Sequence, residues 1–315
     1  MPDPVPLWPG GLMPLGGQQV FVRAAGSAAG AAAAAEPALC VHGLEGSSAN
    51  WTDLAAALLP EMACEAVDLP GFGYSPPPPN ARGYSVTAQA RVVTRLIERS
   101  GRGPVHLIGN SLGGAVSVRA AAARPDLIRT LTLISPLLPD RWPDPSLFRF
   151  PLLCVPGLGG WLISRAGQYP AERRAAAVAA IVCHDPSAVH PARLAEEAAE
   201  LERRDALVYA GDALIQSTRA VVAERFGRAL WREAARITVP TLVMFGSHDR
   251  LVDPRLAGRA ARTFGCARVI VLARTGHVAQ IERPATVAAE IRALGMRQQA
   301  ARLTHVKPVR PIGSA

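Results

Sequence analysis

The chain has 315 residues, of which 49% are hydrophobic, so its length and composition indicate a globular protein with a large core and exclude a disordered chain. The formal net charge of +9 could indicate a nucleic-acid or membrane-surface partner, but nearly every basic residue is an arginine, and Lys307 is the single lysine. Because the arginines are scattered, with no block of five, we attribute the charge to compositional bias and expect no nucleic-acid partner.

The elements predicted along the chain follow a Pro- and Gly-rich arm over residues 1–17. Strands that are apolar on both faces and alternate with helices are typical of a mostly parallel sheet that is covered on both sides. The predicted fold is therefore α/β, with a mostly parallel twisted sheet and helices on both of its faces. We expect strands over residues 18–24, 38–43, 64–71, 104–109, 129–135, 240–246 and 267–273, and helices over 51–60, 85–100, 111–124, 254–264 and 284–296.

One interval interrupts this alternation, because about a hundred residues follow Ser135 without a convincing core strand. The interval opens with several prolines and then becomes helical and rich in Ala and Arg, which argues against a simple crossover helix. We predict a helical cap inserted into the fold. The expected units are an N-terminal arm (1–17), a core (18–135 and 237–297), the cap or lid (136–236) and a basic C-terminal tail (298–315).

The cysteines predict neither a disulfide framework nor a zinc site, since they are five in number, dispersed and without CxxC spacing. The N-terminus lacks the basic and apolar regions of a signal peptide, and no apolar run reaches the length of about 18 to 20 residues that a membrane span needs. We expect free thiols, a cytoplasmic location and no integral membrane segment. No metal or cofactor is indicated, and the sequence carries no signal for the oligomeric state.

The stretch "GPVHLIGNSLGG" (103–114) places Ser111 at the bend between a buried strand and a helix. In a strand–GxSxG–helix arrangement the turn is so tight that the residues two before and two after the serine need to lack side chains, as Gly109 and Gly113 do. The turn lifts the hydroxyl to the helix N-terminus, where free N–H groups favour negative charge. Ser111 is the candidate nucleophile, and the alternative is an ordinary glycine-rich turn.

A serine hydroxyl becomes a good nucleophile only when a base removes its proton. His277 is the candidate base, because it follows the last predicted strand and Gly276 at the sheet edge where Ser111 lies. The acid that orients this histidine is predicted to be Asp249, three residues beyond the strand that precedes it. Asp253 is the second candidate, although it could instead cap a helix.

Acyl transfer also needs two donors that hold the developing oxyanion. One should be the backbone N–H of Leu112, directly after the serine, and the other the N–H of Leu44, in the loop "VHGLEGSSANW" after the 38–43 strand. Glu45 follows in that loop, and a carboxylate directed at the donors would disfavour an oxyanion, so we expect its side chain to point to solvent.

With these motifs the chain resembles the α/β-hydrolase superfamily over about residues 18–296. The resemblance rests on "HGLEGSSANW", "DLPGFGYS", "GNSLGG", "GSHDRLVDP" and "TGHVAQIERP". It implies a serine hydrolase in which Ser111, Asp249 and His277 are nucleophile, acid and base, in that chain order, and in which the inserted segment is the lid. Relatives with Asp at the elbow form alkyl-ester intermediates, and Ser111 argues against that chemistry. Carbon–carbon bond hydrolases often carry "GNS" but typically place Trp where this chain has Val278.

The predicted function is hydrolysis of carboxylic esters of a small or medium apolar substrate through an acyl-enzyme, in the manner of carboxylesterases and lipases and without a cofactor. Trp142, Trp161 and Tyr169, together with the apolar stretch 147–162, are expected to line the acyl site or else to seal the cap onto the core. The alternatives are carbon–carbon or perhydrolase chemistry on the same triad, and a non-catalytic binding protein. The expected partner is a small-molecule ester.

Overall fold

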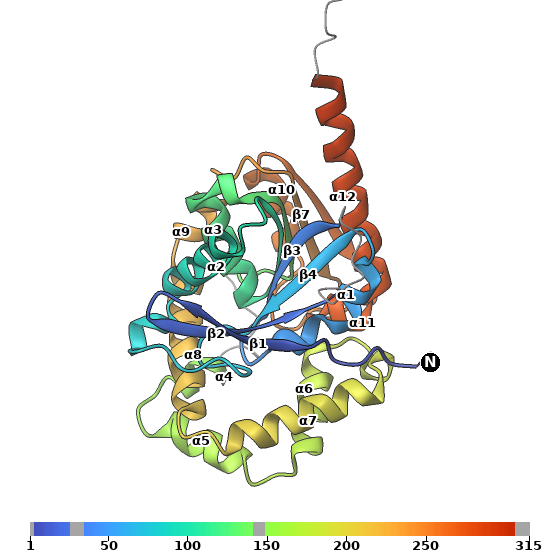
Figure 1. Cartoon of the computed structure of the whole chain (residues 1–315). Coiled ribbons are helices and arrows are strands. Elements are labelled where there is room, and N and C mark those ends of the chain that lie inside the picture. The colour runs from blue at the N-terminus through green and yellow to red at the C-terminus, as the bar shows by residue number, and fades with distance from the viewer. Residues whose placement is uncertain (1–2, 26–34, 141–148, 306–315) are drawn as a thin grey trace, which may run out of the picture.

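The computed structural model describes residues 3–25, 35–140 and 149–305 of the chain (Figure 1). Within them, eight strands form one sheet in the order β1-β2-β4-β3-β5-β6-β7-β8. The pairs β1–β2 and β2–β4 are antiparallel, and every other pair is parallel. The predicted fold class is confirmed. The strands are β1 (Gly10–Leu15), β2 (Gln18–Ala24), β3 (Glu36–Val41), β4 (Met62–Val67), β5 (Val105–Asn110), β6 (Ile128–Ile134), β7 (Thr241–Gly246) and β8 (Ala267–Leu272).

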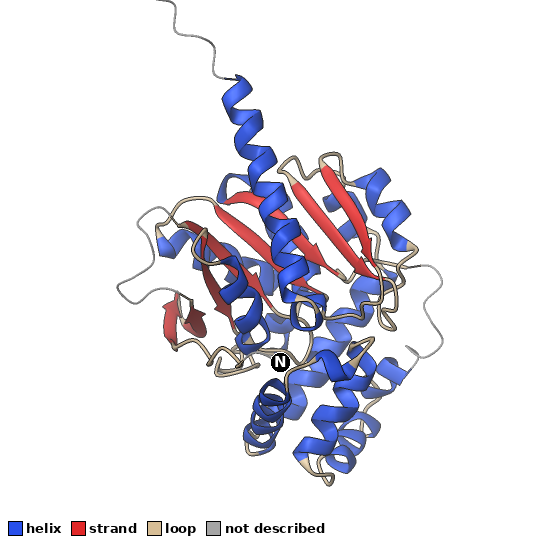
Figure 2. Cartoon of the chain, turned by 90° about the vertical axis from the view of Figure 1, so that its right-hand side faces the viewer, coloured by secondary structure: helices blue, strands red, loops and turns tan. Residues whose placement is uncertain are grey.

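The central strands are apolar on both faces because helices cover both sides of the sheet (Figure 2). Every residue of β5 and β7 is buried. Successive side chains point to opposite faces, so Leu107 belongs to one apolar core and Ile108 to the other. One core lies under α2 (Val86–Ser100), α3 (Leu112–Ala123), α9 (Ala229–Ala234) and α10 (Leu256–Thr263), and the second under α1 (Thr52–Leu58), α11 (Ala279–Glu282) and α12 (Pro284–His305).

In the described part of the chain, five α-helices between β6 and α9 lie beyond the ends of the parallel strands, below the sheet in Figure 1. Among their described residues, α6 and α7 form a small apolar cluster of Ala171, Ala175 and Ala198. Ionic contacts join the inserted helices to the core, as when Nε and Nη2 of Arg193 in α7 each donate to the Asp53 carboxylate at 2.9 Å. Trp231 of α9, the helix after these five, instead packs in the main core and donates a hydrogen bond to the Pro139 carbonyl at 2.7 Å. The five are α4 (Arg149–Leu153), α5 (Leu158–Ala166), α6 (Ala171–Val182), α7 (Pro191–Asp205) and α8 (Ala210–Phe226).

The N-terminal arm predicted over residues 1–17 contains a strand that the sequence analysis missed. β1 pairs with β2 along its whole length, and the chain turns between them at Gly16 and Gly17, whose φ values are +53° and +92°. Glycine adopts this left-handed conformation without steric penalty, so the pair forms the hairpin turn. The Pro- and Gly-rich composition therefore marks an edge hairpin.

The C-terminal tail predicted over residues 298–315 also differs from expectation, because α12 continues to His305 and extends away from the body of the molecule (Figure 1). Residues 306–315 lie outside the described part of the chain. Among the described residues, no helix combines the length and apolar character needed to cross a bilayer.

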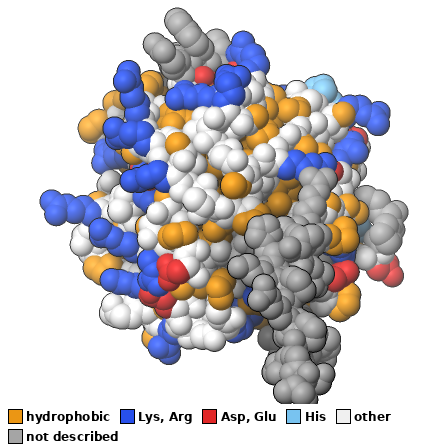
Figure 3. Space-filling model, turned by 90° about the horizontal axis from the view of Figure 1, so that it is seen from above, with side chains coloured by type: hydrophobic (Ala, Val, Ile, Leu, Met, Phe, Trp, Pro, Cys, Tyr) orange, Lys and Arg blue, Asp and Glu red, His pale blue; other side chains and the backbone are white. Residues whose placement is uncertain are grey.

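The surface charge follows the composition of the chain. On the face shown in Figure 3, arginine side chains are dispersed among hydrophobic and uncharged ones. Many described arginines form ion pairs; Arg119, for example, contacts both Glu224 and Glu233. Paired and dispersed charges of this kind project a weaker field than a continuous basic patch of the same net charge.

Candidate active site

Ser111 stands at a strained bend between β5 and α3. Its backbone has φ +54° and ψ −117°, a region that residues with a side chain rarely occupy. Main-chain hydrogen bonds maintain this conformation: the Ser111 N–H donates to the Ile134 carbonyl at 3.1 Å, and its own carbonyl accepts from the Leu137 N–H at 2.9 Å. Hydrogen bonds to β6 and to the segment that follows it thus stabilise the strained conformation of Ser111. The hydroxyl projects from the end of the sheet.

Glycines flank the bend because no side chain fits there. A β-carbon on Gly109 would lie 2.5 Å from the Gly113 carbonyl oxygen, and one on Gly113 would lie 2.1 Å from the carbonyl oxygen of Val41. Both distances are far inside van der Waals contact, so α3 packs directly on the ends of β3 and β5. This is the close packing that the GxSxG spacing predicts.

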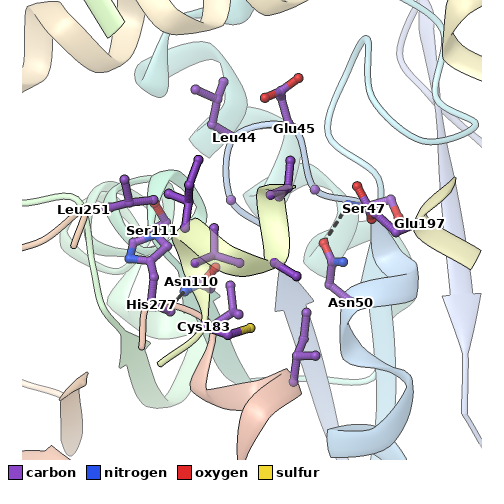
Figure 4. Close-up of a pocket in the computed structure, with 18 of the residues that line it drawn as sticks. Leu44, Glu45, Ser47, Asn50, Asn110, Ser111, Cys183, Glu197, Leu251 and His277 are labelled. Atoms are coloured by element: carbon purple, nitrogen blue, oxygen red, sulfur yellow. Dashed lines mark hydrogen bonds between the residues drawn. The ribbon is translucent and has the colours of Figure 1, made fainter. Parts of the chain in front are cut away.

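His277 and Asp249 meet at the same end of the sheet. Asp249 lies three residues beyond β7, and His277 lies in the loop after β8. The imidazole Nδ1 is 2.9 Å from one carboxylate oxygen and 3.1 Å from the other. The hydrogen bonds of the imidazole among the described residues go to this carboxylate, so Nδ1 carries the proton and Nε2 is left for another partner. In Figure 4 the His277 side chain lies beside Ser111.

The environment of Asp249 keeps it ionised. Burial by itself would raise the pKa of this carboxyl, but the neighbouring His277 and the backbone N–H groups of Leu251 and Val252, at 2.8 and 2.9 Å, lower the pKa below its ordinary value. Asp253, the second candidate, instead binds the Arg255 side chain at 2.7 Å. The structure thus brings Asp249, and not Asp253, to the imidazole.

Three contacts fix the loop that carries His277. Its N–H donates to the Val182 carbonyl, at the end of α6, at 2.6 Å, and its carbonyl accepts from the Asn110 side-chain amide at 3.1 Å. The buried Glu282 carboxylate accepts the Gly276 N–H at 2.7 Å. The same carboxylate also accepts the backbone N–H groups of the two residues after Cys183 in the inserted segment, at 3.2 and 3.1 Å. The imidazole loop is therefore bonded both to the serine elbow and to the inserted helices.

The loop after β3 passes next to the elbow. A β-carbon on Gly43 would lie 3.1 Å from the Ser111 β-carbon, which places the following residue, Leu44, at the same wall. His42 shapes this loop: its Nε2 accepts the Leu69 N–H at 2.9 Å, and its Nδ1 lies 2.7 Å from the Gly43 carbonyl. Burial lowers the pKa of His42, against the opposing effect of a nearby carboxylate, so the ring is neutral with its proton on Nδ1.

Glu45 is exposed and points away from Ser111 (Figure 4). Its φ is +60°, and it lies 3.7 Å from the Arg204 guanidinium of α7. The exposed side chain is as expected, and its pairing with an arginine of the inserted helices is an additional finding. The carboxylate is thereby drawn away from the loop N–H groups that precede it.

Ser111 and His277 line a cavity of roughly 310 Å³ between the sheet and the inserted helices. Its wall is largely apolar, as in sites for small organic molecules. Cys183 also lines it, and burial, followed by the nearby Glu282 and Asp185 carboxylates, raises the pKa of this thiol to about 12, so it stays protonated. The apolar lining includes Leu44, Leu137, Val178, Ile181, Val182, Val189, Leu194, Leu201, Val221, Leu251, Val278 and Ile281.

Two of the predicted substrate-binding aromatics lie elsewhere. Trp161 is 60% exposed and Tyr169 is 45% exposed, and neither lines the cavity that holds Ser111. Tyr169 instead lies under the Arg173 guanidinium, 4.9 Å from ring centroid to carbon. Trp161 lies on α5 and Tyr169 just beyond it, and both rings are exposed to solvent in the structure. Trp142 falls outside the described residues.

Sequence reasoning did not single out three residues that the structure places at the site. Asn110 lies within the motif "GNSLGG" and Glu282 within the motif "TGHVAQIERP", so for both residues the position in a motif was a usable signal. Glu197 lines the cavity from α7 and had none, because its role depends on how the inserted helices pack. Among the described residues, no group of His, Cys, Asp and Glu side chains could hold a metal ion.

Comparisons with known proteins agree with the fold described above. The profile of the family described as "alpha/beta hydrolase fold" matches residues 37–284. Lipase LipV of Mycobacterium tuberculosis is 39% identical over 98 residues, which is 31% of this chain and 36% of that lipase. Lipase 1 of Psychrobacter immobilis is 28% identical over 256 residues, 79% of this chain and 73% of that protein. The solved structure of 2-hydroxy-6-oxo-6-phenylhexa-2,4-dienoate hydrolase from a Rhodococcus strain superimposes with a TM-score of 0.74 at 20% identity and covers 91% of this chain and 98% of that one.

Proposed function

This chain belongs to the alpha/beta hydrolase fold family, and from that premise we propose that it is a serine hydrolase that cleaves carboxylic esters through an acyl-enzyme intermediate. The observation that carries the proposal is the 2.9 Å contact between His277 Nδ1 and the buried Asp249 carboxylate, with His277 and Ser111 lining one apolar cavity. The similarity to two lipases supports the choice of an ester as substrate.

In the first step, His277 Nε2 takes the proton of the Ser111 hydroxyl as the oxygen attacks the ester carbonyl carbon. Asp249 stabilises the imidazolium that forms, because its lowered pKa keeps it ionised at neutral pH. The tetrahedral intermediate then breaks its bond to the leaving oxygen, which receives the proton held on Nε2. The products are a free alcohol and an ester between Ser111 and the acyl group.

The oxyanion of the tetrahedral intermediate is held by two backbone N–H groups in this proposal. The Leu112 N–H is the first of α3 and points along the helix axis toward Ser111. The Leu44 N–H follows Gly43, whose backbone lies against Ser111. Removal of one such donor typically weakens transition-state stabilisation by about 3 to 4 kcal/mol.

Deacylation repeats these roles with water in place of the hydroxyl. His277 removes a proton from a water molecule that attacks the acyl carbon, and the proton then returns to the Ser111 oxygen as the acid leaves. The cavity of roughly 310 Å³ suits a small or medium acyl group. We also propose that the helices α4 to α8 act as the cap that selects the substrate, since α6, α7 and α8 supply much of the apolar lining.

The proposal is tested by a series of 4-nitrophenyl esters of increasing acyl length, with Ser111→Ala as the blank. We expect turnover by the wild type that is absent from the variant, with an optimum at short or medium chains. A vinylogous diketone of the kind cleaved by carbon–carbon bond hydrolases is assayed beside it. Cleavage of the diketone alone would overturn the ester assignment, and cleavage of neither would favour a binding protein.

A further inference from the structure

Helix α7 places one carboxyl group where an apolar side chain would be expected. Along its face toward the cavity, Glu197 lies between Leu194, one turn before it, and Leu201, one turn after it, and all three line the cavity. We propose that Glu197 recognises a positively charged group, an ammonium, on the part of the ester substrate that lies away from the reacting carbonyl. The inference rests on the proposed ester hydrolysis and names the class of substrate.

Glu197 differs from the other acidic residues of the cavity wall in having no partner. Among the described residues it has no hydrogen bond and no ion pair, whereas each of the others contacts an arginine. These pairs are Asp53 and Glu196 with Arg193, Glu200 with Arg203, and Glu45 with Arg204. The arginines beside these four carboxylates are therefore already engaged, and an ammonium that entered the cavity would find a free carboxylate at Glu197.

The surroundings of Glu197 favour a cationic ligand over an anionic one. Burial raises the pKa of its carboxyl to about 7, and the nearby Glu45 and Glu200 act in the same direction against the opposing Arg204. Desolvation therefore disfavours the ionised carboxyl while the cavity is empty, and a bound ammonium would restore the interactions that water supplied. The local excess of carboxylates would repel an anionic substrate group.

The position of Glu197 in the cavity decides which part of the substrate it meets. In Figure 4, Glu197 lies beside Ser47, on the opposite side of the view from Ser111 and His277. An ester carbonyl at Ser111 would therefore need a chain of several atoms to reach this carboxylate. Arg225 also lines the cavity, but its nearest acidic neighbours are Asp140 and Asp253, so it belongs to another part of the wall.

The test compares two 4-nitrophenyl esters of equal length, 6-aminohexanoate and heptanoate, which differ only in a terminal ammonium or methyl group. In the wild type, the ratio of kcat/KM for the ammonium ester to that for the methyl ester should exceed the ratio in Glu197→Gln by about tenfold or more, as expected for a hydrogen bond between charged groups. Glu202→Gln makes the same chemical change on an exposed face of α7 and should keep the wild-type ratio. Each ratio is internal to one preparation, so a smaller folded fraction cancels.

Binding without turnover separates this inference from the proposed reaction. Hexylammonium at pH 8 should raise the Tm of Ser111→Ala, and the shift should vanish when Glu197→Gln is added, while hexanol should act equally on both proteins. Equal ratios in wild type and Glu197→Gln, with both esters hydrolysed, would overturn the role of Glu197 and leave the ester hydrolase intact. A Tm shift that depends on Glu197, with neither ester hydrolysed, would sustain the cation site and overturn the reaction. Equal Tm shifts in both proteins would overturn the cation site.

Discussion

Replacement of Glu282 by glutamine should loosen the loop that carries the proposed base. The Glu282 carboxylate is 7% exposed and accepts three backbone N–H groups, from Gly276 at 2.7 Å, His184 at 3.2 Å and Asp185 at 3.1 Å. The first of these adjoins His277, and the other two follow α6 in the inserted segment. The carboxylate therefore joins the base to the cap through one buried group.

The expected loss of stability follows from the replacement of one hydrogen-bond acceptor by a donor. Glutamine keeps the shape of Glu282, but its NH₂ group faces at least one of the three N–H donors, which loses its acceptor. A hydrogen bond to a charged group contributes about 1.5 to 3 kcal/mol, and a buried donor without a partner costs about 1 to 3 kcal/mol. We expect Glu282→Gln to lower the free energy of unfolding by about 3 kcal/mol. We also expect kcat to fall by about tenfold or more, because a misplacement of about 1 Å at a catalytic group has effects of at least this size.

The assay is urea unfolding beside ester turnover, with Glu290→Gln as the matched control. Glu290 pairs with Arg268 in a partly exposed ion pair on α12 and β8, for which the expected loss is at most about 1 kcal/mol. If Glu282→Gln and Glu290→Gln have the same unfolding midpoint and the same kcat, the carboxylate does not hold the His277 loop, and the reasoning is refuted.

Three further changes test separate parts of the account. Asp249→Asn should lower kcat by about four orders of magnitude with the fold intact, because the amide favours the wrong tautomer of His277; a loss below tenfold would exclude the proposed role. Gly113→Ala should abolish soluble folded protein, since its β-carbon would lie 2.1 Å from a carbonyl oxygen of β3, whereas Gly160→Ala, with open space at its β-carbon, should fold normally. The pKa of Glu197 is raised to about 7 in the folded state, whereas the unfolded chain releases this proton near pH 4.5. Between these two pH values the folded state binds more protons than the unfolded chain, so the free energy of unfolding of the wild type should fall as the pH rises from 4.5 to 7. Glu197→Gln should gain up to about 3 kcal/mol over the wild type between pH 4 and pH 8 in urea titrations, and an equal gain at both pH values would contradict the raised pKa.

The sheet could be predicted from the sequence because its central strands are apolar on both faces. β5 and β7 read as continuous buried runs, and the structure places each within one residue of the predicted range. β1 escaped because its residues Gly10–Leu15 include glycine and proline, and the strand is defined by its pairing with β2 at the sheet edge. An edge strand of this kind has little periodicity of its own.

The residues around the proposed nucleophile were predictable because parallel strands bring their carboxyl ends to one edge. Ser111, Asp249 and His277 each follow a different strand, so the fold alone gathers them. Trp161 and Glu197 lie in the inserted helices, where the packing decides which side of a helix faces the cavity. Helical periodicity leaves that choice open, so an aromatic was assigned to the cavity and the partly buried carboxyl of Glu197 was missed.

Intact-mass spectrometry after treatment with a fluorophosphonate shows whether the hydroxyl of Ser111 is an activated nucleophile. We expect one covalent phosphonyl adduct per wild-type chain, located at Ser111, no adduct on Ser111→Ala and a much slower reaction of His277→Ala. An unmodified wild type, or an adduct that persists on Ser111→Ala, would contradict this expectation.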